Sequence, residues 1–530
     1  MRERVNAAGG IMLLDSVKGY PYKNCYFKFA IVVIKGVQNI IFKYWRYHLL
    51  LLIQSSSILP DMKKMLFMVL AVIISAATFA KVSLPAIFGS HMVVQQNTQL
   101  KIWGWSDPGE KIVIKCSWDT TTYTTKATGM AKWETAIVTP AAGKNYTISI
   151  TGTSNTVLLE DVLIGEVWLA SGQSNMEMNI NWGMKYEEEV KAATNNEIRF
   201  FYIPKTTSLY PAEDVKAQWV VCTPETMKSF STAAYFFGSK LHAQLKVPVG
   251  LICASWGGTP AEVWTPEEIV ENDAILKNAA EKLKPIEWWP TTPGAAYNAM
   301  IAPLTNFPIA GAIWYQGESN TSASSTYQRL FTSMISEWRN KWNADFPFYF
   351  VQIAPYTYGD NNVCALLREA QTKSTVFKKT GMVVTSDLVD NISDIHPKLK
   401  KEVGERLANY ALADHYAQTG IAYKSPAYKS MQVEKNKIRI NFSDAEKGLL
   451  IKGKTASEFY IAGADKKFVP AMVKLQGSTV VVWSKEITAP VAVRFGFSNT
   501  AMPNVFSTEG LPVNLFRTDD WNIDTSPVKK

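Results

Sequence analysis

The segment Gly172–Met176, with the sequence Gly-Gln-Ser-Asn-Met, contains the residue best suited to nucleophilic chemistry, Ser174. It follows the apolar stretch Val162–Ala170, which is typical of a buried strand. A turn at the end of a strand lifts a serine hydroxyl clear of the sheet, as the nucleophile of a serine hydrolase requires. The segment lacks the Gly-x-Ser-x-Gly pattern, and Gly, Ser and Asn also form ordinary turns. Ser174 is therefore a candidate nucleophile that needs partners elsewhere in the chain.

A base must accept the serine proton, and histidine is the side chain that most often does so. Four histidines follow residue 80. His91 lies in a predicted β domain, and His242 and His415 lie on predicted helices, where a lone histidine is usually structural. His396 stands after a predicted strand and directly before a proline, and it is the predicted base.

Asp394 precedes His396 by two residues and is the predicted acid of a catalytic triad. From that position its carboxylate can hold the imidazole through Nδ1, which leaves Nε2 free to take the serine proton. The alternative is that Asp394 caps the helix that is predicted to begin at Pro397. Asp387 and Asp390 are nearby alternatives for the triad acid.

The tetrahedral intermediate of ester hydrolysis needs hydrogen-bond donors for its oxyanion. The candidates are the backbone N–H groups of Ser174 and Gly258 and a side-chain amide of Gln316 or Asn320. Gly258 lets the backbone approach a ligand closely, although it is equally consistent with a plain tight turn. Glu318 lies between the two amides and is expected to order its loop by hydrogen bonding rather than to act as a base.

Residues 62–80 have the pattern of a signal peptide, with a basic start, an apolar run from Met65 and a small-residue end at Ala80. We interpret residues 1–61 as an upstream over-translation, because a signal peptide begins a chain. The alternative is an N-terminal membrane anchor with an internal hydrophobic helix. The signal peptide predicts export to the periplasm or the extracellular space, and no membrane span is predicted in the mature chain.

The net charge of +9 lies mostly in the first 80 residues, which carry ten Lys and Arg against three Asp and Glu. The rest of the chain has a net charge of +2, so the charge gives no reason to expect nucleic acid as a partner. The sequence shows no ligand cluster at metal spacing and no phosphate-binding loop, so neither a metal nor another cofactor is predicted. Cys253 lies in an apolar run and is predicted to be a buried thiol.

Three regions differ in their patterns. Residues 81–160 contain short β-branched and aromatic runs separated by turns, which predict an N-terminal β domain of sandwich type. Residues 161–415 alternate between strand and helix patterns, which predict a parallel sheet with helices on both faces. Residues 416–525 return to strand patterns and predict a C-terminal β module. Predicted strands of the middle region are 162–170, 248–254, 310–315, 348–354 and 381–386, and its predicted helices are 230–245, 327–342 and 397–415.

The candidate residues share one position relative to these elements. Ser174, Gly258 and Gln316 each follow a predicted strand, and the carboxyl ends of parallel strands are where an α/β sheet places its active site. The stretches 175–230 and 267–292 show no clear pattern, and they are predicted to be loops that pass over this site.

Several motifs together resemble the sialate O-acetylesterases of the SGNH-hydrolase superfamily: Gly172–Met176, Ser255–Thr259, Trp314–Asn320, Leu367–Gln371 and Asp394–Pro397. Further similarity extends the resemblance over most of residues 82–520, at Phe88–Gln95, Gly104–Glu110 and Glu509–Asp519. The resemblance implies a three-layer α/β/α catalytic domain with β-sandwich-like modules at both ends and deacetylation of O-acetylated sugars without a cofactor. It also implies that Ser174 is the nucleophile and His396 the base.

The sequence departs from the superfamily pattern in two places. The usual Asp-x-x-His spacing is Asp-x-His here, and the usual Gly-x-Asn is replaced around Gly317, so the acid and the oxyanion amide stay open. Arg368 is a candidate to bind a sialic acid carboxylate, with an ion pair on the helix surface to Glu369 or another acid as the alternative. Trp256 is a candidate to stack on a sugar ring, although tryptophan is also a common core residue.

The predicted function is that of an exported serine esterase that removes O-acetyl groups from sialic acid or related glycans. One alternative is an acetylesterase acting on xylan or another hemicellulose, since the same motifs serve that chemistry. Another is a non-catalytic protein that binds glycans through its β modules and tryptophans, but the intact set of Ser174, His396 and Asp394 argues against it. The sequence gives no indication of the oligomeric state.

Overall fold

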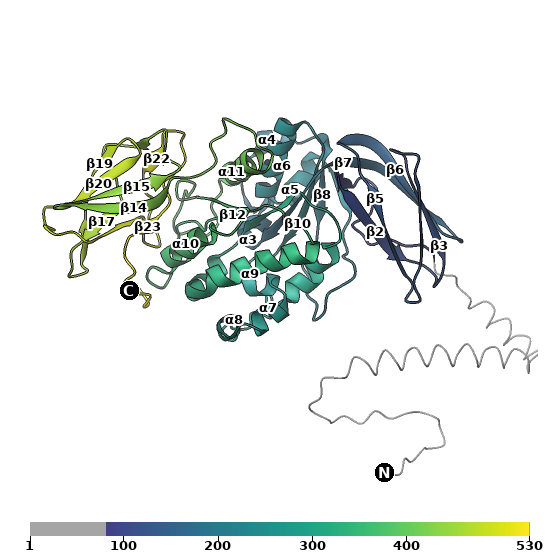
Figure 1. Ribbon diagram of the computed structural model, residues 1–530, viewed down its shortest axis with the longest axis horizontal. Coiled ribbons are helices and arrows are strands. Elements are labelled where there is room, and N and C mark those ends of the chain that lie inside the picture. Colours follow the sequence, from purple (N-terminus) through teal and green to yellow (C-terminus); the bar gives the residue numbers. More distant parts are fainter. Residues whose placement is uncertain (1–80, 529–530) are drawn as a thin grey trace, which may run out of the picture. The chain divides into compact units, whose positions relative to one another are not determined.

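A mixed β-sheet centred on the 17-residue strand β7 (Thr156–Gly172) positions the candidate residues. The computed structural model describes residues 81–528, so the predicted signal peptide and over-translation lie outside the described residues (Figure 1). From one edge of the catalytic part to the other, the strands that flank β7 are β13 (Thr380–Val383), β12 (Phe348–Val351) and β11 (Gly311–Tyr315) on one side, and β10 (Val249–Ser255), β8 (Asn195–Tyr202) and β9 (Trp219–Cys222) on the other.

Neighbouring strands in this part of the sheet are parallel, except that β9 runs antiparallel to β8. Every residue of β10 and β11 is buried, because helices cover both faces of a parallel sheet and its strands become continuous apolar runs. Such runs are visible in a sequence, and the predicted strands are confirmed. β8 and β9 fall in a stretch predicted to be loop, since β8 begins with polar residues and β9 has only four residues.

Helices cover both faces of this sheet: α6 (Thr232–Leu245) and α11 (Lys400–Tyr410) lie on one face, and α9 (Ser324–Trp342) and α10 (Val363–Ser374) on the other (Figure 1). Successive side chains of β11 point to opposite faces of the sheet, so they contribute to different cores. Ile313 belongs to the core under α6 and α11, whereas Trp314 belongs to the core under α9. The predicted three-layer α/β/α domain is confirmed.

Shorter helices occupy the connections: α3 (Ser174–Glu177), α4 (Glu187–Lys191), α5 (Pro224–Ser229), α7 (Glu267–Glu271) and α8 (Ala274–Ala280). The helix predicted to begin at Pro397 begins instead at Lys400, because Asp394 accepts a hydrogen bond from the His396 N–H and holds that segment in a turn. Along the described residues, no helix combines the length and apolar character needed to cross a membrane.

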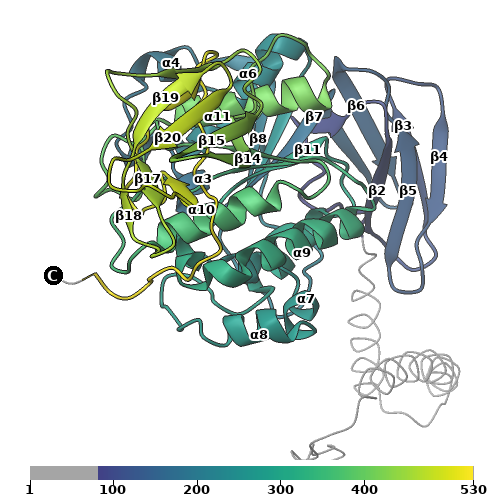
Figure 2. The ribbon, with the colours of Figure 1, turned by 60° about the vertical axis from the view of Figure 1, so that its left-hand side comes forward.

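The N-terminal module consists of β1 (Val93–Gln95), β2 (Gln99–Trp105), β3 (Lys111–Cys116), β4 (Thr122–Lys126), β5 (Lys132–Val138) and β6 (Gly143–Thr151) (Figure 2). The first half of β7 pairs with β6, and its second half pairs with β10 and β11. One strand therefore belongs to both regions, and the predicted boundary between residues 160 and 161 lies inside it.

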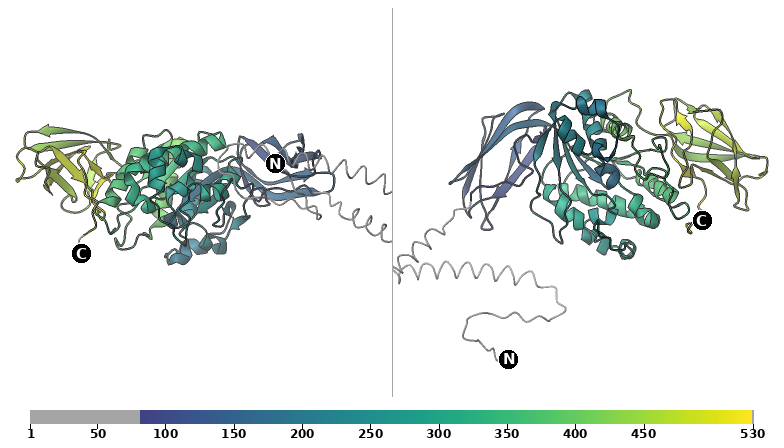
Figure 3. Two further views of the ribbon diagram at one scale, coloured as in Figure 1. Left: turned by 90° about the horizontal axis from the view of Figure 1, so that it is seen from below. Right: turned by 180° about the vertical axis from the view of Figure 1, so that it is seen from behind.

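The C-terminal module has three small sheets (Figure 3). The first is formed by β14 (Ala427–Glu434), β15 (Lys437–Ser443), β20 (Thr479–Trp483) and β19 (Met472–Gln476), and the second by β18 (Phe468–Pro470), β17 (Phe459–Ala462), β21 (Ala492–Phe495) and β23 (Phe516–Arg517). The third is formed by β16 (Leu449–Ile451) and β22 (Val505–Ser507). Ile440, Ile461 and Val480 are fully buried in a core of its own. This module matches the predicted β-rich C-terminal region.

Candidate active site

Three neighbouring strands end at the same level of the sheet. Gly172 at the end of β7 lies in register with Ser255 of β10 and with Tyr315 of β11. Because these strands are parallel, the chain leaves all three at one edge, and the motifs that follow them come together there. Ser174 and Gly258, which the sequence separates by more than 80 residues, belong to this edge.

The turn after β7 requires glycine at position 172. Gly172 has a φ of 136°, and a Cβ there would lie 2.2 Å from the Tyr315 carbonyl oxygen. Two backbone bonds of 3.0 Å fix the turn between the neighbouring strands, from the Gln173 N–H to the Tyr315 oxygen and from the Trp256 N–H to the Gly172 oxygen. Ser174 then begins α3, so its hydroxyl stands on a rigid support.

Ser174 and His396 form the predicted nucleophile–base pair. The Ser174 Oγ lies 2.9 Å from Nε2 of His396, which is hydrogen-bond distance. Burial lowers the pKa of His396, and the nearby Lys400 charge lowers it further. A lowered pKa keeps the imidazole neutral near pH 7, which is the form that can accept the serine proton.

Asp394 lies beside His396 but does not hydrogen-bond its ring. Its Oδ1 is 3.7 Å from Nδ1 of the imidazole and accepts the His396 backbone N–H at 2.9 Å. The alternative that Asp394 caps the next helix is wrong, because α11 begins at Lys400 and its N-cap position is Leu399. Asp387 is engaged by Arg406 through two bonds of 2.7 and 2.8 Å, so its carboxylate serves another partner.

The Gly257–Gly258 turn brings backbone against the nucleophile. A Cβ on Gly257 would lie 3.2 Å from the Ser174 Cβ, but the Gly257 N–H is engaged, because it donates to Glu177 Oε2 at 2.6 Å. Gly258 has a φ of 80°, and Trp289 fills the space that a Cβ would need. Within residues 81–528, the N–H groups of Ser174 and Gly258 have no protein acceptor, so both can still donate to an oxyanion.

Comparison with known proteins agrees with this geometry. Residues 164–413 match the family described as carbohydrate esterase, sialic acid-specific acetylesterase. The crystal structure of a carbohydrate acetylesterase from Xanthomonas citri is 34% identical, matches 83% of this chain and 100% of its own, and has a TM-score of 0.77. The sialate O-acetylesterases of Pongo abelii and Homo sapiens are 28% and 27% identical over 64% of this chain and 72% of theirs.

The chain belongs to the sialate O-acetylesterase family of carbohydrate esterases. It is therefore a carboxylic ester hydrolase, and the predicted family is confirmed. The part of the chain that matches the family, residues 164–413, also contains Ser174, Gly258 and His396.

The two predicted oxyanion amides of the esterase lie in a buried hydrogen-bond network. Both N–H groups of the Gln316 amide are engaged, by the Thr259 carbonyl at 3.2 Å and by Asn320 Oδ1 at 2.7 Å. Asn320 donates to Glu262 Oε2 at 2.8 Å and is 1% exposed. We call Gln316, Asn320 and Glu262 the Asn320 cluster. Both amide hydrogens of Gln316 are thus occupied, which corrects the prediction that Gln316 serves the oxyanion, whereas that role for Asn320 stays a prediction.

Arg368 of the esterase does not face the nucleophile. It is 1% exposed and donates to the carbonyl oxygens of Ser498 at 2.5 Å and Gly496 at 3.4 Å, both in the C-terminal module. Glu369 instead binds Arg517, with an Nε–Oε1 distance of 2.9 Å. Both predictions for Arg368, as a carboxylate ligand and as the partner of Glu369, are wrong, because sequence does not give the direction of a helical side chain.

Tryptophan side chains lie beside His396 and in the segments that follow β7 and β10. The Trp182 ring meets the His396 ring edge-on, with 5.7 Å between centroids, and is 39% exposed. Trp256 is half-buried and donates its Nε1–H to the Trp288 carbonyl at 3.2 Å. Trp288 is 71% exposed. Trp256 was a sequence candidate, whereas Trp182 and Trp288 were missed because both lie in stretches without a clear pattern.

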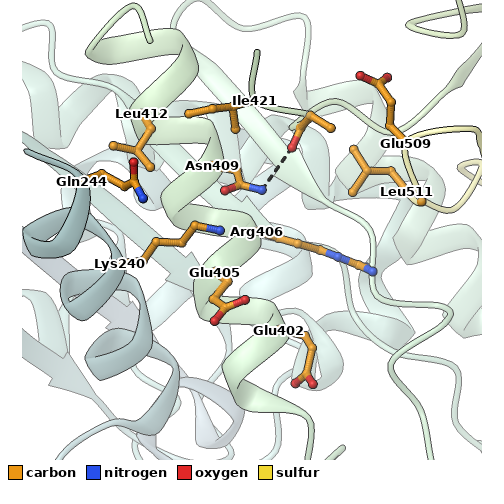
Figure 4. Close-up of a pocket in the computed structure, with 12 residues that line it drawn as sticks. Lys240, Gln244, Glu402, Glu405, Arg406, Asn409, Leu412, Ile421, Glu509 and Leu511 are labelled. Atoms are coloured by element: carbon orange, nitrogen blue, oxygen red, sulfur yellow. Dashed lines mark hydrogen bonds between the residues drawn. The ribbon is translucent and has the colours of Figure 1, made fainter. Parts of the chain in front are cut away.

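A separate cavity of about 450 Å³ lies between α6, α11 and the C-terminal module. Figure 4 shows Lys240, Glu402 and Arg406 around it, together with the 3.0 Å bond from Asn409 Nδ2 to the Ala422 carbonyl. Neither Ser174 nor His396 lines this cavity, so it is distinct from the esterase site.

The described residues contain no group of three or more His, Cys, Asp and Glu side chains arranged to hold a metal ion. Cys253 is buried and has a free thiol, as predicted. Sequence reasoning missed the buried Lys400, which hydrogen-bonds Asn175 next to Ser174, because lysine is ordinarily a surface residue.

Proposed function

We propose that this esterase is an exported serine hydrolase that removes O-acetyl groups from sugars, with Ser174 as nucleophile, His396 as base and Asp394 as the acid beside the base, which holds the turn of His396 through its backbone N–H. The observation that carries the proposal is the 2.9 Å contact between Ser174 Oγ and His396 Nε2 at the carboxyl edge of a parallel sheet. The signal-peptide pattern of residues 62–80 supports export.

In this mechanism Ser174 Oγ attacks the acetyl carbonyl carbon while His396 Nε2 takes the hydroxyl proton. The N–H groups of Ser174 and Gly258 bind the negative charge that develops on the carbonyl oxygen. His396 returns the proton to the sugar oxygen as the ester bond breaks, which leaves an acetyl-enzyme. Water then loses a proton to His396 and attacks the acetyl carbon, which releases acetate and restores Ser174.

An O-acetylated sialic acid is the first substrate candidate, because the relatives from Pongo abelii and Homo sapiens are named sialate O-acetylesterases. A specific observation favours a neutral acetylated glycan such as acetylated xylan as the second candidate. All arginines after residue 80 already bind acids or backbone carbonyls: Arg199, Arg329, Arg339, Arg368, Arg406, Arg439, Arg494 and Arg517. Because each of these guanidinium groups already has at least one partner, none is left wholly unpaired to bind a sialate carboxylate.

Acetate release from 9-O-acetylated sialic acid and from acetylated xylan, measured with the wild-type protein and with Ser174→Ala, tests the proposal. Release by the wild type that disappears in Ser174→Ala is expected, and the preferred substrate decides between the two candidates. Ser171→Ala is the matched control, since Ser171 is a buried serine of β7 whose hydroxyl has no hydrogen-bond partner within the described chain. An active Ser174→Ala would overturn the assignment of the nucleophile.

Export is tested separately by expressing the full chain in a host that secretes proteins and sequencing the N-terminus of the mature product. A mature chain that begins at Lys81 is expected. An esterase that retains residues 62–80 and stays in the cytoplasm would contradict export without affecting the catalytic assignment.

A further inference from the structure

Asn175 connects the two turns that carry the reacting side chains. It follows Ser174 directly, is 1% exposed, and uses both hydrogens of its Nδ2 group. One is donated to Glu318 Oε1 at 2.6 Å, and the other to the carbonyl oxygen of Ile395 at 3.1 Å. Because Ile395 immediately precedes His396, a single amide ties the nucleophile's turn to the base's turn.

Lys400 holds the remaining atom of that amide. Its Nζ donates to Asn175 Oδ1 at 2.5 Å and lies 4.8 Å from the centre of the Tyr315 ring. The side chain of Lys400 is fully buried, although lysine is almost never fully buried unless it is paired. A buried ammonium group that is expensive to desolvate and that contacts the residue next to the nucleophile calls for a functional explanation.

Glu318 provides the opposite charge. It is 6% exposed, and its Oε1 accepts the Asn175 hydrogen bond. Its Oε2 has no hydrogen-bond partner within the described chain. We call Asn175, Glu318 and Lys400 the Lys400 cluster. Its members come from the ends of three separate segments, so the cluster fixes the distances between those segments.

We propose that Lys400 is a positioning residue of the esterase, which acts through Asn175 to hold Ser174 and His396 at reacting distance and whose positive charge favours the neutral imidazole. The inference rests on the proposed roles of Ser174 and His396. Lys400 contacts neither of them directly, so it contributes geometry and charge rather than proton transfer.

The charges around the pair support this role. Burial lowers the pKa of Lys400 to about 7, and the nearby Glu318 opposes that shift. Lys400 in turn lowers the pKa of His396. The other charged groups near His396 and Lys400 are Lys398, Asp394 and Asp390, which precede α11. Below about pH 7 Lys400 is protonated, so its charge is present in the range where His396 titrates.

Three lysine variants separate the two contributions. Lys400→Met removes both the hydrogen bond and the charge, whereas Lys400→Gln keeps an N–H donor and removes only the charge. Lys401→Met is the matched control, because Lys401 is the next residue of α11 and pairs at the surface with Glu189. For each variant, kcat and KM are measured from about pH 5 to pH 9. A serine-directed organophosphate counts the active sites, so that loss of folded protein is not mistaken for loss of catalysis.

We expect Lys400→Met to lower kcat per active site by about tenfold or more with little change in KM, because misplaced reacting groups lose orientation. The acidic limb of its kcat/KM profile moves to higher pH, since loss of the Lys400 charge raises the pKa of His396. Lys400→Gln regains part of kcat but shows the same shift of the acidic limb. Lys401→Met matches the wild type in both measurements.

An acidic limb that stays in place in both Lys400 variants, or moves equally in Lys401→Met, would overturn the proposal. If Lys400→Met does not fold, Lys400→Gln alone decides the charge contribution. Ser174→Ala separates this inference from the assignment on which it rests. Loss of activity in Ser174→Ala with wild-type profiles in the Lys400 variants would refute only the positioning role.

Discussion

Two buried polar clusters lie at the same end of β11, and they differ in charge and in what they connect. The Lys400 cluster contains a buried cation and a buried acid, and it joins the turns that carry Ser174 and His396. The Asn320 cluster contains amides and one acid, and it joins the segment after β11 to the segment after β10. Both are almost fully buried, so burial alone does not distinguish their roles.

The difference shows how to separate positioning from stability in a buried network. In the Asn320 cluster both hydrogens of the Gln316 amide are donated, one to Thr259 and one to Asn320, and buried polar groups are normally paired in this way. Burial raises the pKa of the acid in both clusters, Glu318 and Glu262, but only in the Lys400 cluster does a carboxylate oxygen, Oε2 of Glu318, stay unpaired within the described chain. Perturbed ionisation together with incomplete pairing is typical of functional sites. We therefore expect changes in the first cluster to affect stability and changes in the second to affect catalysis.

The largest expected effect comes from removing His396, the proposed base that the Lys400 cluster is proposed to position. His396→Ala should lower kcat by about 10²–10⁴-fold, because proton transfer by the imidazole is lost. Adding Lys400→Met to His396→Ala should then cost little more, since the imidazole that it positions is absent. Measurement of kcat for both single variants and the double variant completes the cycle. A full further tenfold loss in the double variant would show that Lys400 acts independently of His396.

Asn320→Ala should affect the folded state instead. The substitution removes the acceptor of one Gln316 N–H, the acceptor of the Ala261 N–H and the donor to Glu262 Oε2, all of them buried. We expect the free energy of unfolding to fall by about 1–3 kcal/mol, with kcat per active site within about twofold of the wild type. Denaturant unfolding and titrated kinetics measure the two quantities. Asn306→Ala, at an exposed asparagine, is the control and should change stability by less than about 0.5 kcal/mol. A large loss of kcat in Asn320→Ala would place the Asn320 cluster with the catalytic groups.

The buried charge of Lys400 also predicts how stability depends on pH. Its pKa is 10.5 in the unfolded chain and about 7 in the folded protein. Between these values the unfolded state binds one more proton than the folded state, so the free energy of unfolding rises with pH. The rise should approach about 1.4 kcal/mol per pH unit relative to Lys400→Met, which lacks the group. Parallel unfolding curves of the two proteins between about pH 7 and pH 9 would contradict the buried ionisation.

The sequence predicts the central strands and the reacting side chains for a physical reason. The second half of β7, β10 and β11 are buried on both faces, and continuous apolar runs of this kind are visible without a structure. Ser174 and His396 are recognisable because each follows such a strand and because few other residue types perform their chemistry. The parallel topology then brings their turns to one edge.

Side-chain direction could not be predicted in the same way. Arg368 and Gln316 stand at the predicted places along the chain, but one reaches the C-terminal module and the other the Asn320 cluster. The partners of Arg368 lie far away in sequence, and Gln316 combines a distant partner, Thr259, with Asn320 only four residues on, so no local pattern fixes either direction. Lys400 was missed for the opposite reason, since its type indicates a surface position and only the folded structure shows that it is buried.

Asp394→Asn has the smallest expected effect on catalysis, and it tests the direction in which a nearby charge shifts the pKa of His396. Asp394 Oδ1 accepts the His396 backbone N–H, and asparagine keeps that oxygen, so the turn should persist. The carboxylate lies 3.7 Å from Nδ1, beyond hydrogen-bond distance, and we therefore expect kcat to fall by less than about tenfold. Because the charge of Asp394 raises the pKa of His396, its removal should move the acidic limb of kcat/KM to lower pH.

That shift is opposite in direction to the one expected for Lys400→Met, although both variants remove one charge near the same imidazole. Opposite shifts would show that the two charges act on His396 itself, which a general loss of structure cannot imitate. Asp387→Asn is the matched control, since Asp387 pairs with Arg406 and should leave the limb in place. A loss of kcat of about a thousandfold in Asp394→Asn would instead mean that the carboxylate closes on Nδ1 once substrate is bound.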